Sequence, residues 1–157
     1  MDASTDTFEA ALGALAETLV TEQDLDSLLH QIAGLACVAI PRCTFAGVTV
    51  VEEGAFRTSA RSHPEVQSLD DAQYRADDGP CLVACRTAEV VVVEDATHND
   101  RWPQFSATAG EHAVRSSFSA PLTASGSSLG ALNLYSRTTG PYDDQAASFA
   151  ALCAAQS

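Results

Sequence analysis

The sequence contains no lysine: its eight basic residues are all arginine, and they face 21 acidic residues, so the formal net charge is −13. The arginines are scattered along the chain. Nucleic acids and anionic membranes attract clustered cations, so we expect no direct binding to nucleic acid and no membrane binding. The loop of the usual nucleotide hydrolases needs a glycine-lysine pair, and this chain has none.

Long hydrophobic runs are also missing, since no apolar stretch approaches the roughly 20 residues of a membrane span. The N-terminal residues 1–10, MDASTDTFEA, lack the basic start and apolar stretch of a secretory signal. The five cysteines are odd in number and irregularly spaced, which argues against a disulfide framework. We therefore expect a cytoplasmic protein with reduced thiols, and no metal site.

What the chain does have is enough apolar material, 46% of 157 residues, for one domain with a substantial core. Apolar residues at helical spacing predict amphipathic helices over 6–20, 22–40 and 143–156. Proline signals predict shorter helices over 63–75, 80–87 and 103–112. Period-two patterns and turn residues predict strands over 44–52, 55–61, 90–93, 114–123 and 128–137.

Two of the turns join neighbouring strands as hairpins, so the sheet is expected to be antiparallel, with about five or six strands, in an α+β fold. One face of the strands is purely apolar, with Val48 and Leu134 as examples, and is predicted to meet the terminal helices. The other face carries Thr49, Asn133 and Tyr135 beneath the irregular middle of the chain. A small space with a few polar groups is typical of a ligand pocket.

Several short motifs occur in a fixed order between Gly79 and Arg137: DGPCL at 78–82, RT at 86–87, VVVV at 90–93, DRWP at 100–103, VRS at 114–116, APL at 120–122 and GALNLYS at 130–136. In this order the sequence resembles a bacterial GAF domain. It is most similar to the GAF domains that precede an RNA-binding ANTAR domain in transcription antitermination regulators. The resemblance implies a PAS-like sheet with terminal helices on one face and a pocket on the other.

The same resemblance implies a single GAF domain over 1–157, with N-terminal helices over 6–40, a sheet and pocket region over 44–137, and a C-terminal helix over 143–156. The sequence stops at Ser157 without an ANTAR module, so we expect either a fragment of a longer regulator or a stand-alone GAF protein. The implied function is a regulatory sensor that binds a small molecule and signals through its terminal helices, in transcription regulation. An alternative is a dimerisation module without a ligand; in either case we expect a homodimer through the terminal helices.

Nine residues are candidates for the pocket, and the ligand or cofactor itself stays open: Thr49, Tyr74, Cys81, Trp102, Phe105, Ser116, Phe118, Asn133 and Tyr135. The four aromatic residues other than Tyr135 could equally be core. Haem-binding GAF domains use a histidine, which would make His98 or His112 an axial ligand, but both are expected to be solvated.

Cys81 and Cys85 lie four residues apart on one helix face, and small buried thiols are the simpler interpretation of the pair. GAF-type enzymes that reduce free methionine sulfoxide carry a cysteine near the position of Cys81. They need a further cysteine later in the chain, and residues 94–118 contain none. The resulting expectation is a protein that is not an enzyme and has no catalytic residue, with reductase activity as a minor alternative.

Overall fold

The structure is a computed structural model that describes residues 25–124 and 127–155. The helix expected over 6–20 lies outside the described residues. Within them, the element order is helix, hairpin, two helices, a short strand, a helix, a second hairpin and a final helix. None of the helices in this described part combines the length and apolar character that a membrane span requires.

The described strands form one five-stranded antiparallel sheet with the order β2-β1-β5-β4-β3. Each strand lies close to its predicted range: β1 is Phe45–Glu52, β2 is Ala55–Arg61, β3 is Val91–Val93, β4 is Ser116–Ala124 and β5 is Ser127–Ser136. The predicted α+β fold class is confirmed. The central position of β1 and β5 matters for the site, because their side chains reach both layers of helices.

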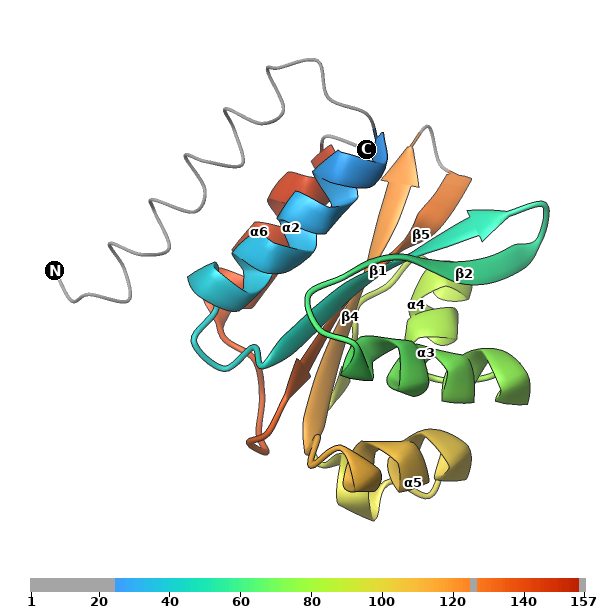
Figure 1. Cartoon of the computed structure of the whole chain (residues 1–157), viewed down its shortest axis with the longest axis vertical. Coiled ribbons are helices and arrows are strands. Elements are labelled where there is room, and N and C mark those ends of the chain that lie inside the picture. Colours follow the sequence, from blue (N-terminus) through green and yellow to red (C-terminus); the bar gives the residue numbers. More distant parts are fainter. Residues whose placement is uncertain (1–24, 125–126, 156–157) are drawn as a thin grey trace, which may run out of the picture.

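Helices cover both faces of the sheet (Figure 1). The longer pair, α2 (Leu25–Ala39) and α6 (Asp144–Ala155), lies on one face, and α3 (Glu65–Ala76), α4 (Pro80–Thr87) and α5 (Pro103–Glu111) lie on the other. Proline occupies the first turn of both α4 and α5, where no backbone N–H is needed. Asp143 begins α6 by accepting hydrogen bonds from the backbone N–H groups of Gln145 and Ala146.

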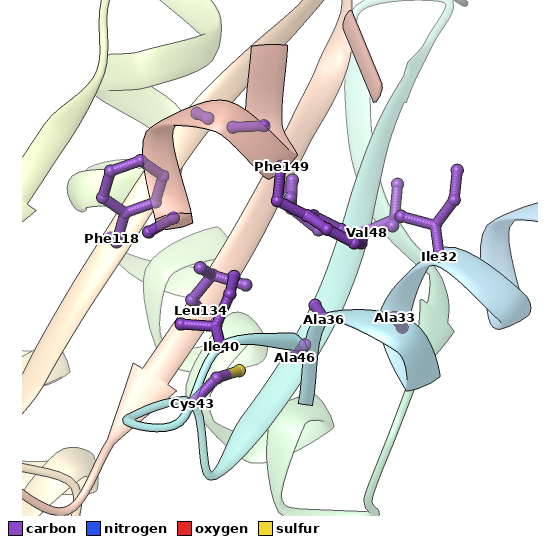
Figure 2. Close-up of a cluster of buried hydrophobic side chains, with 14 of the residues drawn as sticks. Ile32, Ala33, Ala36, Ile40, Cys43, Ala46, Val48, Phe118, Leu134 and Phe149 are labelled. Atoms are coloured by element: carbon purple, nitrogen blue, oxygen red, sulfur yellow. The ribbon is translucent and has the colours of Figure 1, made fainter. Parts of the chain in front are cut away.

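The face beneath α2 and α6 is apolar, as predicted. Figure 2 shows Val48 of β1 and Leu134 of β5 in one cluster with Phe149 of α6 and Ile32 of α2. Val48, Leu134 and Phe149 are fully buried. Burial of such side chains contributes roughly 1.5–3 kcal/mol each, so this cluster holds the terminal helices to the sheet.

The backbones of β1 and β5 approach closely at Gly130, which pairs with Val50. A Cβ atom at Gly130 would lie 1.8 Å from the carbonyl oxygen of Thr49, and the residue has φ +155°. Any side chain would push these two central strands apart. Glycine is therefore required where the candidate residues of both strands are brought together.

Candidate functional site: a buried polar cluster

Thr49, Asn133 and Tyr135 point away from α2 and α6, toward α3 and α4, as the alternation of the strands predicts. All three are fully buried. Thr49 comes from β1, while Asn133 and Tyr135 are separated by one residue on β5 and pair with Gly47 and Phe45 of β1. This sheet face therefore places polar side chains in the interior, where each one needs a hydrogen-bond partner.

The centre of the cluster is Asp70 of α3, which is fully buried. Tyr135 donates to its Oδ1 at 2.5 Å, and Thr58 of β2 donates to its Oδ2 at 2.6 Å. The Tyr74 hydroxyl lies 3.5 Å from the same Oδ2. Burial raises the pKa of Asp70 to about 6, although the hydroxyl donors work in the opposite direction. No basic side chain within the described residues forms an ion pair with this carboxylate.

Thr49 is the second centre of the cluster. Its hydroxyl lies 2.7 Å from the Tyr74 hydroxyl, accepts from Asn133 Nδ2 at 3.0 Å and contacts Cys81 Sγ at 3.2 Å. Asn133 Oδ1 is buried and has no hydrogen-bond partner in the described part of the chain. An unpaired buried acceptor of this kind costs roughly 1–3 kcal/mol, so the arrangement is not optimised for stability alone.

Gln73 ties α3 to the start of α4. Its Oε1 accepts from the backbone N–H of Cys81 at 2.9 Å, and its Nε2 donates to the Tyr135 hydroxyl at 3.2 Å. The backbone of Gly79 lies so close to Gln73 that a Cβ at this position would be 2.5 Å from the Gln73 side chain. One fully buried amide thus connects both helices to the sheet.

The cluster reaches the surface between β2 and α4. Phe56, Thr58 and Tyr74 are partly exposed, and the Phe56 and Tyr74 rings stack with centroids 6.4 Å apart. The Arg86 guanidinium lies 5.4 Å from the Phe56 ring centroid and forms an ion pair with Asp77. These side chains close the polar interior from solvent.

The two cysteines of α4 differ in environment. Cys81 is fully buried, and its pKa is raised well above the ordinary value by its hydrogen bond with Cys85 and by burial. The same hydrogen bond lowers the pKa of Cys85. Of the two, Cys85 is therefore the one that ionises more readily.

Trp102 and Phe105 belong to a neighbouring apolar cluster with Tyr135. The Phe105 and Tyr135 rings have centroids 6.3 Å apart. Trp102 Nε1 donates to Asp78 at 3.1 Å. Both residues are almost completely buried, so they form a wall beside the polar cluster and are core residues at the same time.

Ser116 and Phe118 lie on the opposite face, so the expectation that they share a pocket with Tyr135 is wrong. Phe118 packs in the cluster beneath α2 and α6, with its ring 5.4 Å from that of Tyr142. Ser116 donates to the carbonyl of Thr138. The sequence of β4 has small or polar residues at both odd and even positions. Its alternation therefore did not reveal which side chains face α2 and α6 and which face the shorter helices.

Sequence reasoning missed Thr58, Asp70 and Gln73. A signal was present for α3, because Val66, Leu69, Asp70 and Gln73 follow the i, i+3, i+4, i+7 stripe of a buried helix face. Residues 63–75 were predicted as a helix, but Asp70 was given no role in the site. Thr58 offered no comparable signal, because its role depends on the pairing of β2 with β1.

The surface also has a hollow of about 350 Å³ between α3 and α5, away from the nine candidates, with the lining Ala72, Arg75, Ala76, Gln104, Ala107 and Thr108. His98 is exposed and contacts Asp95 at 2.8 Å. Within the described ranges, no three histidine, cysteine or acidic side chains gather as a metal site. The polar cluster is therefore the strongest candidate site.

A five-stranded antiparallel sheet, helices on both faces and a polar cluster under the shorter helices define a small α+β fold. The family model for the GAF domain matches residues 22–157. The chain therefore belongs to the GAF domain family. Comparison by sequence with curated proteins gives no match.

Solved structures of the same fold include another GAF domain and free methionine-R-sulfoxide reductases. The GAF domain of an Acinetobacter phosphoenolpyruvate-protein phosphotransferase has a TM-score of 0.75 at 16% identity, over 94% of this chain and 87% of that one. Staphylococcus aureus fRMsr, in its reduced form, has a TM-score of 0.74 at 14% identity, over 95% and 94%. Free methionine-R-sulfoxide reductase from Neisseria meningitidis, in complex with its substrate, has a TM-score of 0.71 at 16% identity, over 99% and 91%.

These structures correct one expectation from the sequence. The chain was expected not to be an enzyme because residues 94–118 contain no cysteine. That expectation is overturned, because free methionine-R-sulfoxide reductases are among the solved structures with this fold, so enzymatic activity is not excluded. At these identities the likeness concerns the fold alone. Whether this chain is a catalyst therefore depends on its own cysteines.

Proposed function

We propose that this GAF domain is a regulatory sensor whose polar cluster binds a small molecule with a cationic or N–H-donating group. The observation that carries the proposal is Asp70, a fully buried carboxylate that is held by hydroxyl groups and has no cationic partner among the described residues. A buried carboxylate is stabilised most by a positive charge or by charge-assisted hydrogen bonds. An anionic ligand would be repelled.

A second feature supports the same class of ligand. Asn133 Oδ1 is an unpaired acceptor, so the cluster offers two acceptors, Asp70 and Asn133, to one donor-rich molecule. Tyr74 joins them, because its hydroxyl contacts Thr49 at 2.7 Å and Thr58 at 2.9 Å. Entry requires displacement of the Phe56 and Tyr74 rings, which are the partly exposed members at the surface.

The terminal helices are the proposed output. Tyr135 and Leu134 are neighbours on β5, one in the polar cluster and the other in the apolar cluster with Phe149 of α6. A ligand that displaces the Tyr135 hydroxyl from Asp70 would shift β5 against α6. Such a relay would serve transcription regulation of the GAF-ANTAR type, which the motif order between Gly79 and Arg137 supports.

The test is native mass spectrometry of the freshly purified full chain, followed by thermal unfolding with small primary amines and their matching carboxylic acids. We expect amines to bind and carboxylic acids not to. Asp70→Asn should weaken binding roughly 10- to 100-fold, as expected for the loss of a charged hydrogen bond. Asp71→Asn is the matched control, because Asp71 accepts from Gln67 instead of joining the cluster.

Two results would contradict the sensor proposal. One is the absence of any bound molecule together with no amine-dependent rise in the unfolding temperature. The other is equal behaviour of Asp70→Asn and Asp71→Asn. The relay is tested separately by hydrogen exchange, in which a bound amine should change the exchange of α6 amides.

Reductase activity is a second candidate, favoured by the position of Cys81 against Thr49 and by the lowered pKa of Cys85. The Cys85 thiolate would attack the sulfur of methionine sulfoxide, the S–O bond of the sulfoxide would break, and the oxygen would pass to Cys85 with a proton from water as a sulfenic acid, releasing methionine. The Cys81 thiol would then form a disulfide with release of water. Dithiothreitol in the assay would reduce that disulfide.

Methionine formation from free methionine-R-sulfoxide, measured by chromatography, tests this candidate. Cys81→Ser and Cys85→Ser should each abolish turnover, whereas Cys43→Ser, on the other face of the sheet, should not. Absence of methionine with the wild-type chain would dispose of the reductase candidate and leave the sensor proposal untouched.

A further inference from the structure

Two cysteines meet where the chain leaves α2 and enters β1, far from the polar cluster. Cys37 is in the last turns of α2 and Cys43 follows the end of the helix, and their sulfur atoms are 3.7 Å apart. Backbone hydrogen bonds from Ile40 to Ala36 and from Cys43 to Ile40 close the intervening turn. The pair is therefore held together by local structure rather than by a chance contact of two mobile side chains.

The two thiols have different exposure. Cys43 is buried at the end of the apolar cluster, where Figure 2 draws it close to Ile40 and Ala46. Cys37 is partly exposed and packs against the same cluster. An oxidant from solvent therefore reaches Cys37 before Cys43.

The electrostatics favour Cys37 as the reactive member. Its hydrogen bond with Cys43 lowers the pKa of Cys37 to about 7, and Ser62 acts in the same direction. The pKa of Cys43 is raised by the same hydrogen bond and by burial. The Ser62 hydroxyl itself lies 2.7 Å from His63 Nδ1. Reactivity toward oxidants follows the thiolate and its exposure.

We propose that Cys37 and Cys43 are a reversible oxidation site, in which a hydroperoxide converts the pair into an intramolecular disulfide. The Cys37 thiolate attacks one oxygen of the hydroperoxide, the O–O bond breaks, and Cys37 becomes a sulfenic acid. The other oxygen leaves as hydroxide or alkoxide, which takes up a proton. The Cys43 sulfur then attacks the Cys37 sulfur, the S–O bond breaks, and the oxygen leaves with a proton as water. The two sulfurs must approach from 3.7 Å to about 2.0 Å.

The consequence would fall on the terminal-helix layer. A disulfide would join the end of α2 to the start of β1, and Cys43 belongs to the cluster that also contains Phe149 of α6. Oxidation would thus act on the same helices as the proposed sensor, from the opposite face of the sheet. It needs neither Asp70 nor a bound amine, so it stands independently of the proposed function.

The sequence makes this disulfide unusually easy to identify. Because the chain has no lysine and Arg42 is its first arginine, trypsin cuts between the two cysteines and leaves peptides 1–42 and 43–57. Each peptide contains a single cysteine. A disulfide would therefore link these two peptides and no others, whereas Cys81 and Cys85 share the peptide 76–86.

The experiment treats the reduced full chain with hydrogen peroxide, blocks free thiols and maps the tryptic peptides of the monomeric species. We expect a 1–42/43–57 linked pair that dithiothreitol removes. Cys43→Ala should abolish the link and leave a Cys37 sulfenic acid that dimedone traps. Cys37→Ala should leave Cys43 reduced, and Cys85→Ser should leave the link unchanged.

If a variant fails to fold, the tryptic peptide map of the peroxide-treated wild-type chain is sufficient to test the proposal. Peroxide treatment that oxidises other cysteines but never links 1–42 with 43–57 would overturn the proposal. So would a link found only between separate chains. Equal peroxide consumption by Cys37→Ala and the wild type would refute the role of Cys37 as the attacking thiolate.

Discussion

The guanidinium group of Arg42 lies over the ring of Tyr142, with Cζ 4.7 Å from the ring centroid. Arg42 lies three residues after the end of α2, and Tyr142 lies two residues before the start of α6. The same guanidinium donates to four successive backbone carbonyls of the loop between β5 and α6: Thr138, Thr139, Gly140 and Pro141. One arginine thus joins the exit of one terminal helix to the entry of the other.

Arg42→Ala should lower the free energy of unfolding by about 2 kcal/mol, because a cation–π contact and several hydrogen bonds to carbonyls are lost. Arg42→Lys should recover only part of this, since an ammonium lacks the planar fork. Urea unfolding measures both. Arg61→Ala is the control, and its free energy of unfolding should lie within about 0.5 kcal/mol of the wild type. Equal effects of Arg42→Ala and Arg61→Ala would show that the contacts of Arg42 do not stabilise the fold.

The pKa of Asp70 predicts a pH dependence of stability. Its pKa rises from 3.8 in the unfolded chain to about 6 in the folded protein, so between these values the folded state binds more protons. Asp70 therefore destabilises the fold as pH rises from about 4 to about 6, by an amount on the order of 3 kcal/mol.

The measurement is the free energy of unfolding of the wild type and of Asp70→Asn at several pH values. The difference between them should change in favour of Asp70→Asn from pH 4 to pH 7, and then level off. The pKa of Asp95 is lowered to about 2 by its hydrogen bonds with Thr97 and His98, so its contribution to stability changes with pH in the opposite direction. Because both proteins contain Asp95, this contribution cancels in the difference between them. A constant difference would mean that Asp70 has an ordinary pKa.

Gly130 predicts a large steric effect. Gly130→Ala would place a methyl group 1.8 Å from the Thr49 carbonyl oxygen and should cost about 3 kcal/mol or more. Gly34 is exposed on α2, and apart from its chain neighbours and its own helix backbone no atom of the described residues lies within 4 Å of a Cβ there. Gly34→Ala should instead stabilise by up to about 1 kcal/mol. Thermal unfolding of the pair tests both signs, and similar shifts would contradict the close approach of β1 and β5.

Trp102 is the only tryptophan of the chain, and it is 4% exposed. Its fluorescence should therefore lie at shorter wavelength in the folded than in the unfolded protein and resist quenching by acrylamide. Asp78→Ala removes the acceptor of its indole N–H and should change the folded emission without unfolding the chain. Strong quenching of the native protein would show that Trp102 is accessible to solvent.

The sequence predicted the layers of this fold better than its site. Alternation along β1 and β5 correctly separated Val48 and Leu134 from Thr49 and Tyr135. It failed on β4, where Ser116 and Phe118 were assigned to the wrong face, because serines and other small residues occur on both sides of that strand. Asp70 was missed although a helix was predicted over 63–75 and its position on the buried stripe of α3 carried the relevant information.

Local chemistry alone determined that this is an acidic, lysine-free chain of antiparallel hairpins between helices, since charge, period and proline positions act over a few residues. Only the tertiary structure decided that Asp70 meets the Tyr135 hydroxyl, 65 positions further along, and that the sulfurs of Cys37 and Cys43 lie side by side. Such long-range contacts depend on how the helices pack on the sheet. Packing of that kind is a property of the whole core, and no short window of sequence contains it.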